Sequence, residues 1–195
     1  MSKYSNKGYT VIELLTVAGV LVVITGILTG IIVATLRGTN KTQTANSVAQ
    51  NGNYALSVIS SILISSDAVL GLYDRNSSPT LVLDEDGDCT GSPSGDTIEL
   101  RRVDGGITTL ACENNTIASK SASMTVGLLD SSKVQINTGD SLSCYFKCIQ
   151  EPDDPYSAPS IEVGFTLTDK NNSANVEKNS TADFQTSIKL RNYAP

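Results

Sequence analysis

The side chains of this chain that are best suited to chemistry are its cysteines. The 195-residue sequence has four of them, Cys89, Cys112, Cys144 and Cys148, and all follow its apolar N-terminal segment. An even number of cysteines confined to one part of a chain predicts disulfide bonds formed in an oxidising compartment. A tetrathiolate zinc site is the alternative, but such a site usually takes two close cysteine pairs, and only Cys144 and Cys148 are close. We therefore predict disulfides.

The pairing of these cysteines depends on the strands around them. Cys89 precedes and Cys112 follows a predicted hairpin within residues 97–111, which favours a bond between these two. Cys144 and Cys148 would then pair with each other. In a fully extended strand they would be about 13 Å apart, beyond the Cα reach of roughly 7 Å, so their bond requires a bulge or turn at residues 145–147. A crossed connectivity stays open.

A run of acids around Gly87 is the second group capable of chemistry. Asp84, Asp86 and Asp88, with Glu85 between the first two, could surround a hard cation such as calcium with carboxylate oxygens. The run lacks the distal bidentate Glu of an EF-hand loop, and acidic turns are most often only solvated. A solvated turn is therefore the expectation and no cofactor is predicted, with calcium as the alternative.

The composition argues against an enzyme and against a nucleic-acid-binding protein. The chain has no His, which removes histidine general bases, Ser-His and Cys-His nucleophile systems and His-ligated metals. Paired carboxylates could hydrolyse glycosides, but nothing in the sequence places two acids at a defined separation. The formal net charge is -6, and Lys and Arg do not cluster, so a phosphate backbone is not an expected partner.

Glu13 is the one formally charged residue in the apolar segment of residues 9–36. A helix rises about 1.5 Å per residue, so this segment would span about 42 Å, against a hydrocarbon core of roughly 30 Å. We predict a transmembrane helix over residues 9–36. An isolated charge at the bilayer centre costs on the order of 3 kcal/mol or more, so the presence of Glu13 needs an explanation.

The residues before the apolar segment predict its orientation. Lys3 and Lys7 occur there without an acid, and positive residues hold that end of a membrane helix in the cytoplasm. A secretory signal would have a shorter apolar core followed by a small-residue cleavage site. We expect a single-pass protein whose C-terminal part lies across the membrane.

Residues 7–15, KGYTVIELL, resemble the cleavage and methylation motif of type IV prepilins and type II secretion pseudopilins. In that family a basic residue, Gly and an aromatic residue usually precede TLIELL. The resemblance implies that residues 1–8 are a leader cut off after Gly8 by prepilin peptidase, and that Tyr9 becomes the N-methylated first residue. Tyr9 stands where the family usually has Phe. Glu13 falls at the family's glutamate position, which implies pairing with the terminal amine of a neighbouring subunit.

Small residues give the apolar segment one face suited to helix packing. Gly19, Gly26 and Gly30 recur at steps of seven and four residues, and the GxxxG pattern of the last two permits close approach of helices. Major pilins commonly carry Pro about where Gly30 stands. The absence of this Pro favours a minor pilin or pseudopilin. So does the likeness of residues 184–192 to the closing strand of the minor pilin W and pseudopilin J group.

The helix is expected to continue as an amphipathic stretch over residues 37–70. Apolar residues recur there at steps of three and four, the pattern of a helix half-buried on a domain. They are Val48, Ala55, Val58, Ile59, Ile62 and Leu63. We predict one helix over residues 9–66, with residues 38–52 as its weakest part and the place for local melting, because Gly, Thr and Asn lower helix propensity.

After Gly71 short alternating runs divided by turn residues predict a β-rich extracytoplasmic domain over residues 71–195. The predicted strands are residues 80–83, 97–102, 107–111, 124–129, 134–137, 142–148, 161–168 and 184–191. The last two alternate apolar with polar residues, as half-buried antiparallel strands do. The fold class is α+β, a long N-terminal helix on an antiparallel sheet, which the pilin resemblance also implies.

Together these features predict a minor pilin or pseudopilin that works by assembly. The expected partners are other pilins of its filament, prepilin peptidase, the inner-membrane assembly machinery and, before assembly, the lipid bilayer. The expected location is the bacterial inner membrane, with the N-terminus in the cytoplasm, and after assembly a periplasmic or extracellular filament. The alternative is a surface binding domain or enzyme that uses the helix only as a membrane tether.

Overall fold

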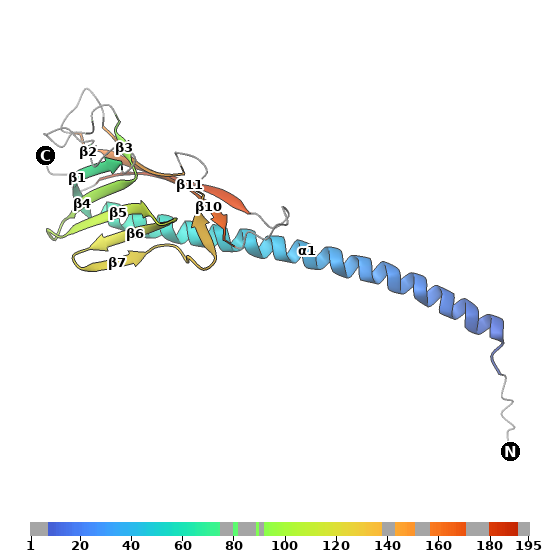
Figure 1. The fold of residues 1–195 in the computed structure, drawn as a ribbon. Coiled ribbons are helices and arrows are strands. Elements are labelled where there is room, and N and C mark those ends of the chain that lie inside the picture. The colour runs from blue at the N-terminus through green and yellow to red at the C-terminus, as the bar shows by residue number, and fades with distance from the viewer. Residues whose placement is uncertain are drawn as a thin grey trace, which may run out of the picture. The chain divides into compact units, whose positions relative to one another are not determined.

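The computed structural model describes residues 8–74, 80–81 (backbone only), 89, 92–137, 143–150, 157–170 and 180–190. The chain divides into two compact units, Met1–Thr42 and Gln43–Pro195. One helix, α1 (Val11–Ile64), begins in the first unit, where Figure 1 draws it in blue. The second unit holds the C-terminal part of α1 and two antiparallel sheets. This arrangement confirms the predicted α+β fold class.

Thr10 starts α1. The backbone N–H of Glu13 lies 3.1 Å from the Thr10 carbonyl oxygen and 3.4 Å from Thr10 Oγ1, as expected for an N-cap residue. The sequence Thr-x-x-Glu is also that of a capping box. An acid in the first turn interacts favourably with the helix dipole. Glu13 therefore has a local role in starting the helix, in addition to any role toward a partner.

Threonine hydroxyls in the apolar part of α1 are satisfied by the helix itself. Thr25, Thr29 and Thr35 each donate a hydrogen bond to the carbonyl four residues earlier, at 2.7, 2.8 and 2.9 Å. A hydroxyl bonded in this way can enter an apolar environment without the cost of an unpaired polar group. These threonines are thus compatible with lipid.

The segment predicted to melt, residues 38–52, is continuous helix. Gly52 is buried, and a Cβ added to it would overlap the ring of Phe184 from the sheet domain. Packing in the second unit thus outweighs the weak local propensity at this end of the segment. The helix ends at Ile64, where the hydroxyls of Ser65 and Ser66 donate to the Ile62 carbonyl at 2.9 and 2.8 Å.

One antiparallel sheet follows the helix in the chain. The order of its described strands is β2-β1-β4-β5-β6-β7. The strands are β1 (Ser66–Asp74), β2 (Thr80–Leu81), β4 (Thr97–Arg102), β5 (Ile107–Glu113), β6 (Thr116–Ser121) and β7 (Met124–Gly127). β4 has the predicted bounds, and the β4–β5 hairpin turns at residues 103–106 as expected.

The second sheet has the order β11-β10-β9-β3, and β8 pairs with β10 beyond the end of β9. Its strands are β3 (Ser94–Gly95), β8 (Val134–Ile136), β9 (Cys144–Ile149), β10 (Ser160–Asp169) and β11 (Thr181–Lys189). The long pair β10–β11, orange to red in Figure 1, corresponds to the two predicted half-buried strands, with ends shifted by up to three residues.

The core of the second unit combines side chains from α1 and from both sheets. The predicted apolar stripe of α1 supplies Val48, Ala55, Ile59 and Leu63, all buried, while Val58 and Ile62 are only partly buried. The fully buried large side chains of the sheets include Leu72, Ile98, Leu100, Leu110, Ile117, Phe146, Ile161 and Leu167. The sequence pattern therefore identified the buried face of the helix.

Three strands were not predicted: β1, β3 and β6. Residues 66–70, assigned to the amphipathic helical stretch, are strand, because they pair with residues 100–102 of β4. β6 carries small and polar residues and pairs along its length with β5. Its strand conformation is determined by that partner and not by its own propensity.

The predicted disulfide pairing is wrong. The bonds join Cys89 to Cys148 and Cys112 to Cys144, with Cα–Cα distances of 5.4 and 6.1 Å. β9 pairs with β10 without a register shift, so it has no bulge that could bring Cys144 and Cys148 together. The connectivity is nested, neither the favoured one nor the crossed one, and the Cys112–Cys144 bond links β5 of one sheet to β9 of the other.

Candidate functional site

The predicted processing position lies in an exposed segment before α1. Gly8 and Tyr9 have no regular secondary structure, and the Tyr9 side chain is 82% exposed. A Cβ added to Gly8 would meet no atom within 4 Å. A peptide bond in such a segment is accessible to a peptidase. Residues 1–7 of the expected leader, with Lys3 and Lys7, lie outside the described residues.

The predicted assembly residues lie along the exposed part of α1. Glu13 is in its first turn, and a Cβ added to Gly19, Gly26 or Gly30 would meet no atom within 4 Å. Gly26 and Gly30 share a shallow, mainly apolar depression, whereas Gly19 lies outside it. The other residues of the depression are Leu21, Val22, Thr25, Thr29 and Val33. Among the described residues, nothing packs against these glycines.

The hydropathy of α1 agrees with the predicted membrane segment. Among the described residues it is the one helix long and apolar enough to cross a membrane. An 18-residue window in it has a mean hydropathy of 2.6, and none of that window is buried. A long apolar helix near the N-terminus fits a single-pass membrane anchor.

The proposed calcium ligands Asp84, Asp86 and Asp88 lie outside the described residues. Within the described part of the chain, no group of three or more His, Cys, Asp or Glu side chains could hold a metal ion.

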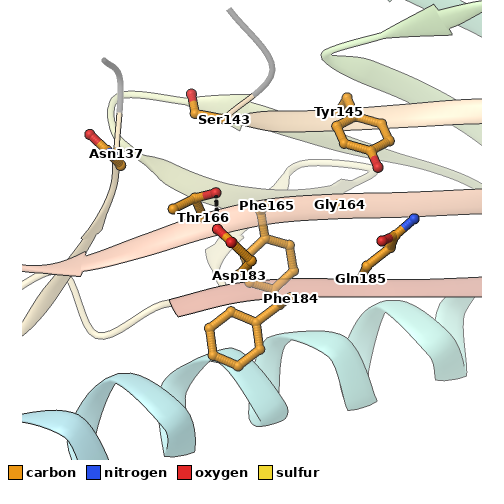
Figure 2. A pocket seen from close by; sticks show the side chains of 9 residues that line it. All are labelled: Asn137, Ser143, Tyr145, Gly164, Phe165, Thr166, Asp183, Phe184 and Gln185. Carbon is orange, nitrogen blue, oxygen red and sulfur yellow. Dashed lines mark hydrogen bonds between the residues drawn. The ribbon is translucent and has the colours of Figure 1, made fainter. Parts of the chain in front are cut away.

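A groove of about 360 Å³ with a mixed polar and apolar lining lies on the outer face of the β9–β10–β11 sheet (Figure 2). Its middle is Gly164 of β10, which stands opposite Tyr145 of β9 and Gln185 of β11. A Cβ on Gly164 would overlap the Tyr145 ring, so the absence of a side chain lets the ring lie over the strand. The rest of the lining is Asn137, Ser143, Phe165, Thr166, Asp183 and Phe184.

Hydrogen bonds hold four polar side chains of the groove in place, those of Tyr145, Gln185, Thr166 and Asp183. The Tyr145 hydroxyl and Gln185 Nε2 both donate to Glu162 Oε1, each at 2.9 Å. Thr166 Oγ1 donates to Asp183 Oδ1 at 2.7 Å, the bond drawn in Figure 2. Burial, and then the hydrogen bond to Glu162, raise the pKa of Tyr145 above its ordinary value, so its phenol remains a donor at neutral pH.

The groove presents hydrogen-bonding groups, and its described residues offer no activated nucleophile. The sequence did not reveal it. Alternation in the last two predicted strands indicated that Gly164 and Gln185 face away from the apolar residues. Their meeting with Tyr145 depends on the register of three strands, which no local pattern encodes.

Comparison of the chain with protein-family models, with curated proteins and with solved structures finds no match. The class that the fold itself defines is an α+β protein with one apolar N-terminal helix able to span a membrane. Two disulfides stabilise its sheet domain.

Proposed function

We propose that this chain is a minor pilin or pseudopilin, a structural subunit of a type IV pilus or a type II secretion pseudopilus. In this proposal prepilin peptidase cuts after Gly8, and the mature chain assembles through α1. The observation that carries the proposal is the position of the motif of residues 7–15. This motif spans the boundary between the exposed N-terminal segment and the first turn of a long, exposed, apolar helix.

The position of Glu13 supports a role in assembly. Cleavage after Gly8 would leave the Tyr9 amine two residues before the start of α1, so an amine and a carboxylate would lie near the same helix end. A carboxylate in an apolar bundle is costly unless it is paired, and the amine of a neighbouring subunit is a suitable partner. The interaction of the Glu13 carboxylate with the helix dipole is worth only about 0.3–1 kcal/mol. That is too little to offset the cost of burying the carboxylate.

The exposed apolar residues of α1 support the same proposal. Large side chains of residues 11–36 are exposed around the whole helix, with Val11 at 82% and Val22 at 73%. An apolar surface of this size requires cover from lipid or from other protein. Lipid would cover it before assembly and neighbouring helices afterwards, and the Gly26–Gly30 depression offers a place for close approach.

Determination of the mature N-terminus tests the proposal. The full chain is expressed in cells with and without prepilin peptidase, and its N-terminus is identified by mass spectrometry. We expect N-methylated Tyr9 when the peptidase is present, and residues 1–8 retained when it is absent or when Gly8 is changed to Ala. A wild-type chain that retains residues 1–8 in both strains would falsify the proposal.

A membrane-tethered binding domain is the second candidate, and the groove over Gly164 favours it. In that reading α1 is only an anchor, and the ordered Tyr145, Glu162 and Gln185 side chains hold a polar ligand. The same experiment separates the two candidates, because a tethered domain would not be cut in a peptidase-dependent way.

A further inference from the structure

The outer edge of β11 pairs with no described strand. β11 ends the order of its sheet and pairs with β10 from Ser160↔Lys189 to Thr168↔Thr181 without a register shift. A straight edge of nine residues without Pro or a bulge is a template for another strand. The edge is therefore suited to an interaction with an extended partner.

Hydrogen bonds at the two ends of β11 determine which backbone groups face outward. The Leu190 N–H donates to the Pro159 carbonyl at 3.0 Å, and the Asp169 N–H donates to the Ser180 carbonyl at 3.2 Å. Hydrogen-bonded and non-hydrogen-bonded pairs alternate along an antiparallel ladder. The even-numbered residues of β11 therefore bond to β10, and the odd-numbered residues direct their N–H and C=O groups away from the sheet.

We propose that this edge pairs with the same edge of a second copy of the chain, antiparallel, around a two-fold axis at Thr186. In this register Asp183 of each copy stands opposite Lys189 of the other, and Phe184 stands opposite Ile188. The proposal concerns the sheet domain alone and does not depend on the pilin function.

Charge and side-chain complementarity select this register. Asp183 and Lys189 are both exposed on the outer face, and opposite charges that face each other across two strands attract. Their outward backbone groups make them a hydrogen-bonded pair, which exchanges two hydrogen bonds. The two-fold axis repeats each of these contacts, so a single strand supplies both halves of the interface.

The inner face of β11 agrees with the same register. Phe184 and Ile188 are only partly buried, and Phe184 stacks on Phe165 with ring centroids 5.4 Å apart. Figure 2 shows the Phe184 ring on the α1 side of the strand, with Asp183 and Gln185 on the other side. The pair Phe184–Ile188 would be non-hydrogen-bonded, the geometry in which facing side chains are closest, and aromatic with β-branched residues pair well.

Neighbouring registers lose these contacts. With Gln185 on the axis, Asp183 stands opposite Ser187, and Phe184 opposite Thr186. With Ser187 on the axis, Lys189 stands opposite Gln185 and Asp183 lies at the diagonal. Both keep backbone hydrogen bonds, since odd residues still face odd residues, but neither pairs the charges.

Symmetric cysteine cross-linking tests the pairing and its register. All four native cysteines are in disulfides, so one introduced cysteine is the free thiol. The full chain is oxidised in detergent micelles as Thr186→Cys, Gln185→Cys, Ser187→Cys or Thr181→Cys, and covalent dimer is measured on non-reducing gels. Thr181→Cys is the control, because its two copies would be on the order of 30 Å apart in this register.

We expect the most dimer from Thr186→Cys and the background level from Thr181→Cys. Equal yields at these two positions would overturn the pairing. A higher yield from Gln185→Cys or Ser187→Cys than from Thr186→Cys would overturn the register.

A second test exchanges the two charges in the Thr186→Cys background, and its double variant controls for misfolding. Asp183→Lys or Lys189→Asp alone places like charges opposite each other and should lower the dimer yield by on the order of tenfold. The double variant Asp183→Lys, Lys189→Asp should restore it. A double variant that stays as low as the single ones would contradict the proposed contacts.

Discussion

At the scale of single residues, Glu13 combines a local and an intermolecular role. Its backbone is part of the Thr10 cap, and its carboxylate is in the first turn of α1. We expect Glu13→Leu to insert into the membrane normally but to be excluded from filaments, because the counter-charge for a neighbouring amine is lost. Alkaline extraction measures insertion, and the chain content of sheared filaments measures incorporation.

Glu13→Gln is the matched control for helix capping. Gln can replace Glu in a capping box, so this variant keeps the local role and removes the charge. We expect it to be excluded from filaments as Glu13→Leu is. Normal incorporation of Glu13→Gln would contradict the ion-pair role.

Asp130, in the turn after β7, should make the stability of the fold depend on pH. Hydrogen bonds from the Ser132 hydroxyl and from the Ser132 N–H, and then Lys133, lower the pKa of Asp130 below its ordinary value of 3.8. Since the folded pKa lies below the unfolded one, the ionised carboxylate stabilises the fold above pH 3.8, and this contribution is lost as the pH falls through the lowered pKa.

NMR titration of the Asp130 carboxyl in the full chain in micelles checks this expectation. Ser132→Ala, which removes the hydrogen bond from the Ser132 hydroxyl, should move the pKa of Asp130 up toward 3.8, and Asp130→Asn should remove this part of the acid sensitivity. A wild-type Asp130 that titrates at or above 3.8 would refute the assignment.

At the scale of elements, the packing of α1 on β11 depends on one glycine. A Cβ on Gly52 would overlap the Phe184 ring, while a Cβ on Gly38 of the same helix would meet no atom within 4 Å. We expect Gly52→Ala to lower the free energy of unfolding by about 1–3 kcal/mol, the usual cost of overpacking. We expect Gly38→Ala to raise helix stability by about 0.5–1 kcal/mol.

Thermal unfolding of both variants in the same micelles, followed by circular dichroism, measures this difference. Both changes add one methyl group to a helical glycine, so propensity alone would move them in the same direction. If Gly52→Ala were as stable as Gly38→Ala, the close contact with Phe184 would not constrain the helix.

At the scale of the whole molecule, the Cys112–Cys144 bond ties together the two sheets of the second unit. It closes a sequence separation of 32 residues, inside the 59-residue separation closed by Cys89–Cys148. Removing such a bond costs about 2–5 kcal/mol, chiefly because the unfolded chain gains freedom. We expect the double variant Cys112→Ser, Cys144→Ser to unfold at a lower temperature but to keep both sheets.

Peptide mapping without reduction and a thermal scan check this prediction. The Cys89–Cys148 peptide should remain in the variant, and the thermal midpoint should fall. Detection of a Cys89–Cys112 peptide in the wild type would reject the nested connectivity.

The sequence by itself determined the features that rest on local periodicity. The charge-poor run of residues 9–36 predicted the exposed apolar helix, and the three- and four-residue spacing from Val48 to Leu63 predicted its buried face. Alternation predicted the β10–β11 pair. These patterns could be read because side chains on one helix face or one strand face are separated by a constant number of residues.

Only the tertiary structure decided which cysteines meet, why Gly52 is tolerated in a helix, and how Tyr145, Gly164 and Gln185 form one groove. It also decided that residues 66–70 leave the helix to become the start of β1. Each of these features depends on the register between segments far apart in the chain. That register is determined by the packing of the whole core, which no short stretch of sequence contains.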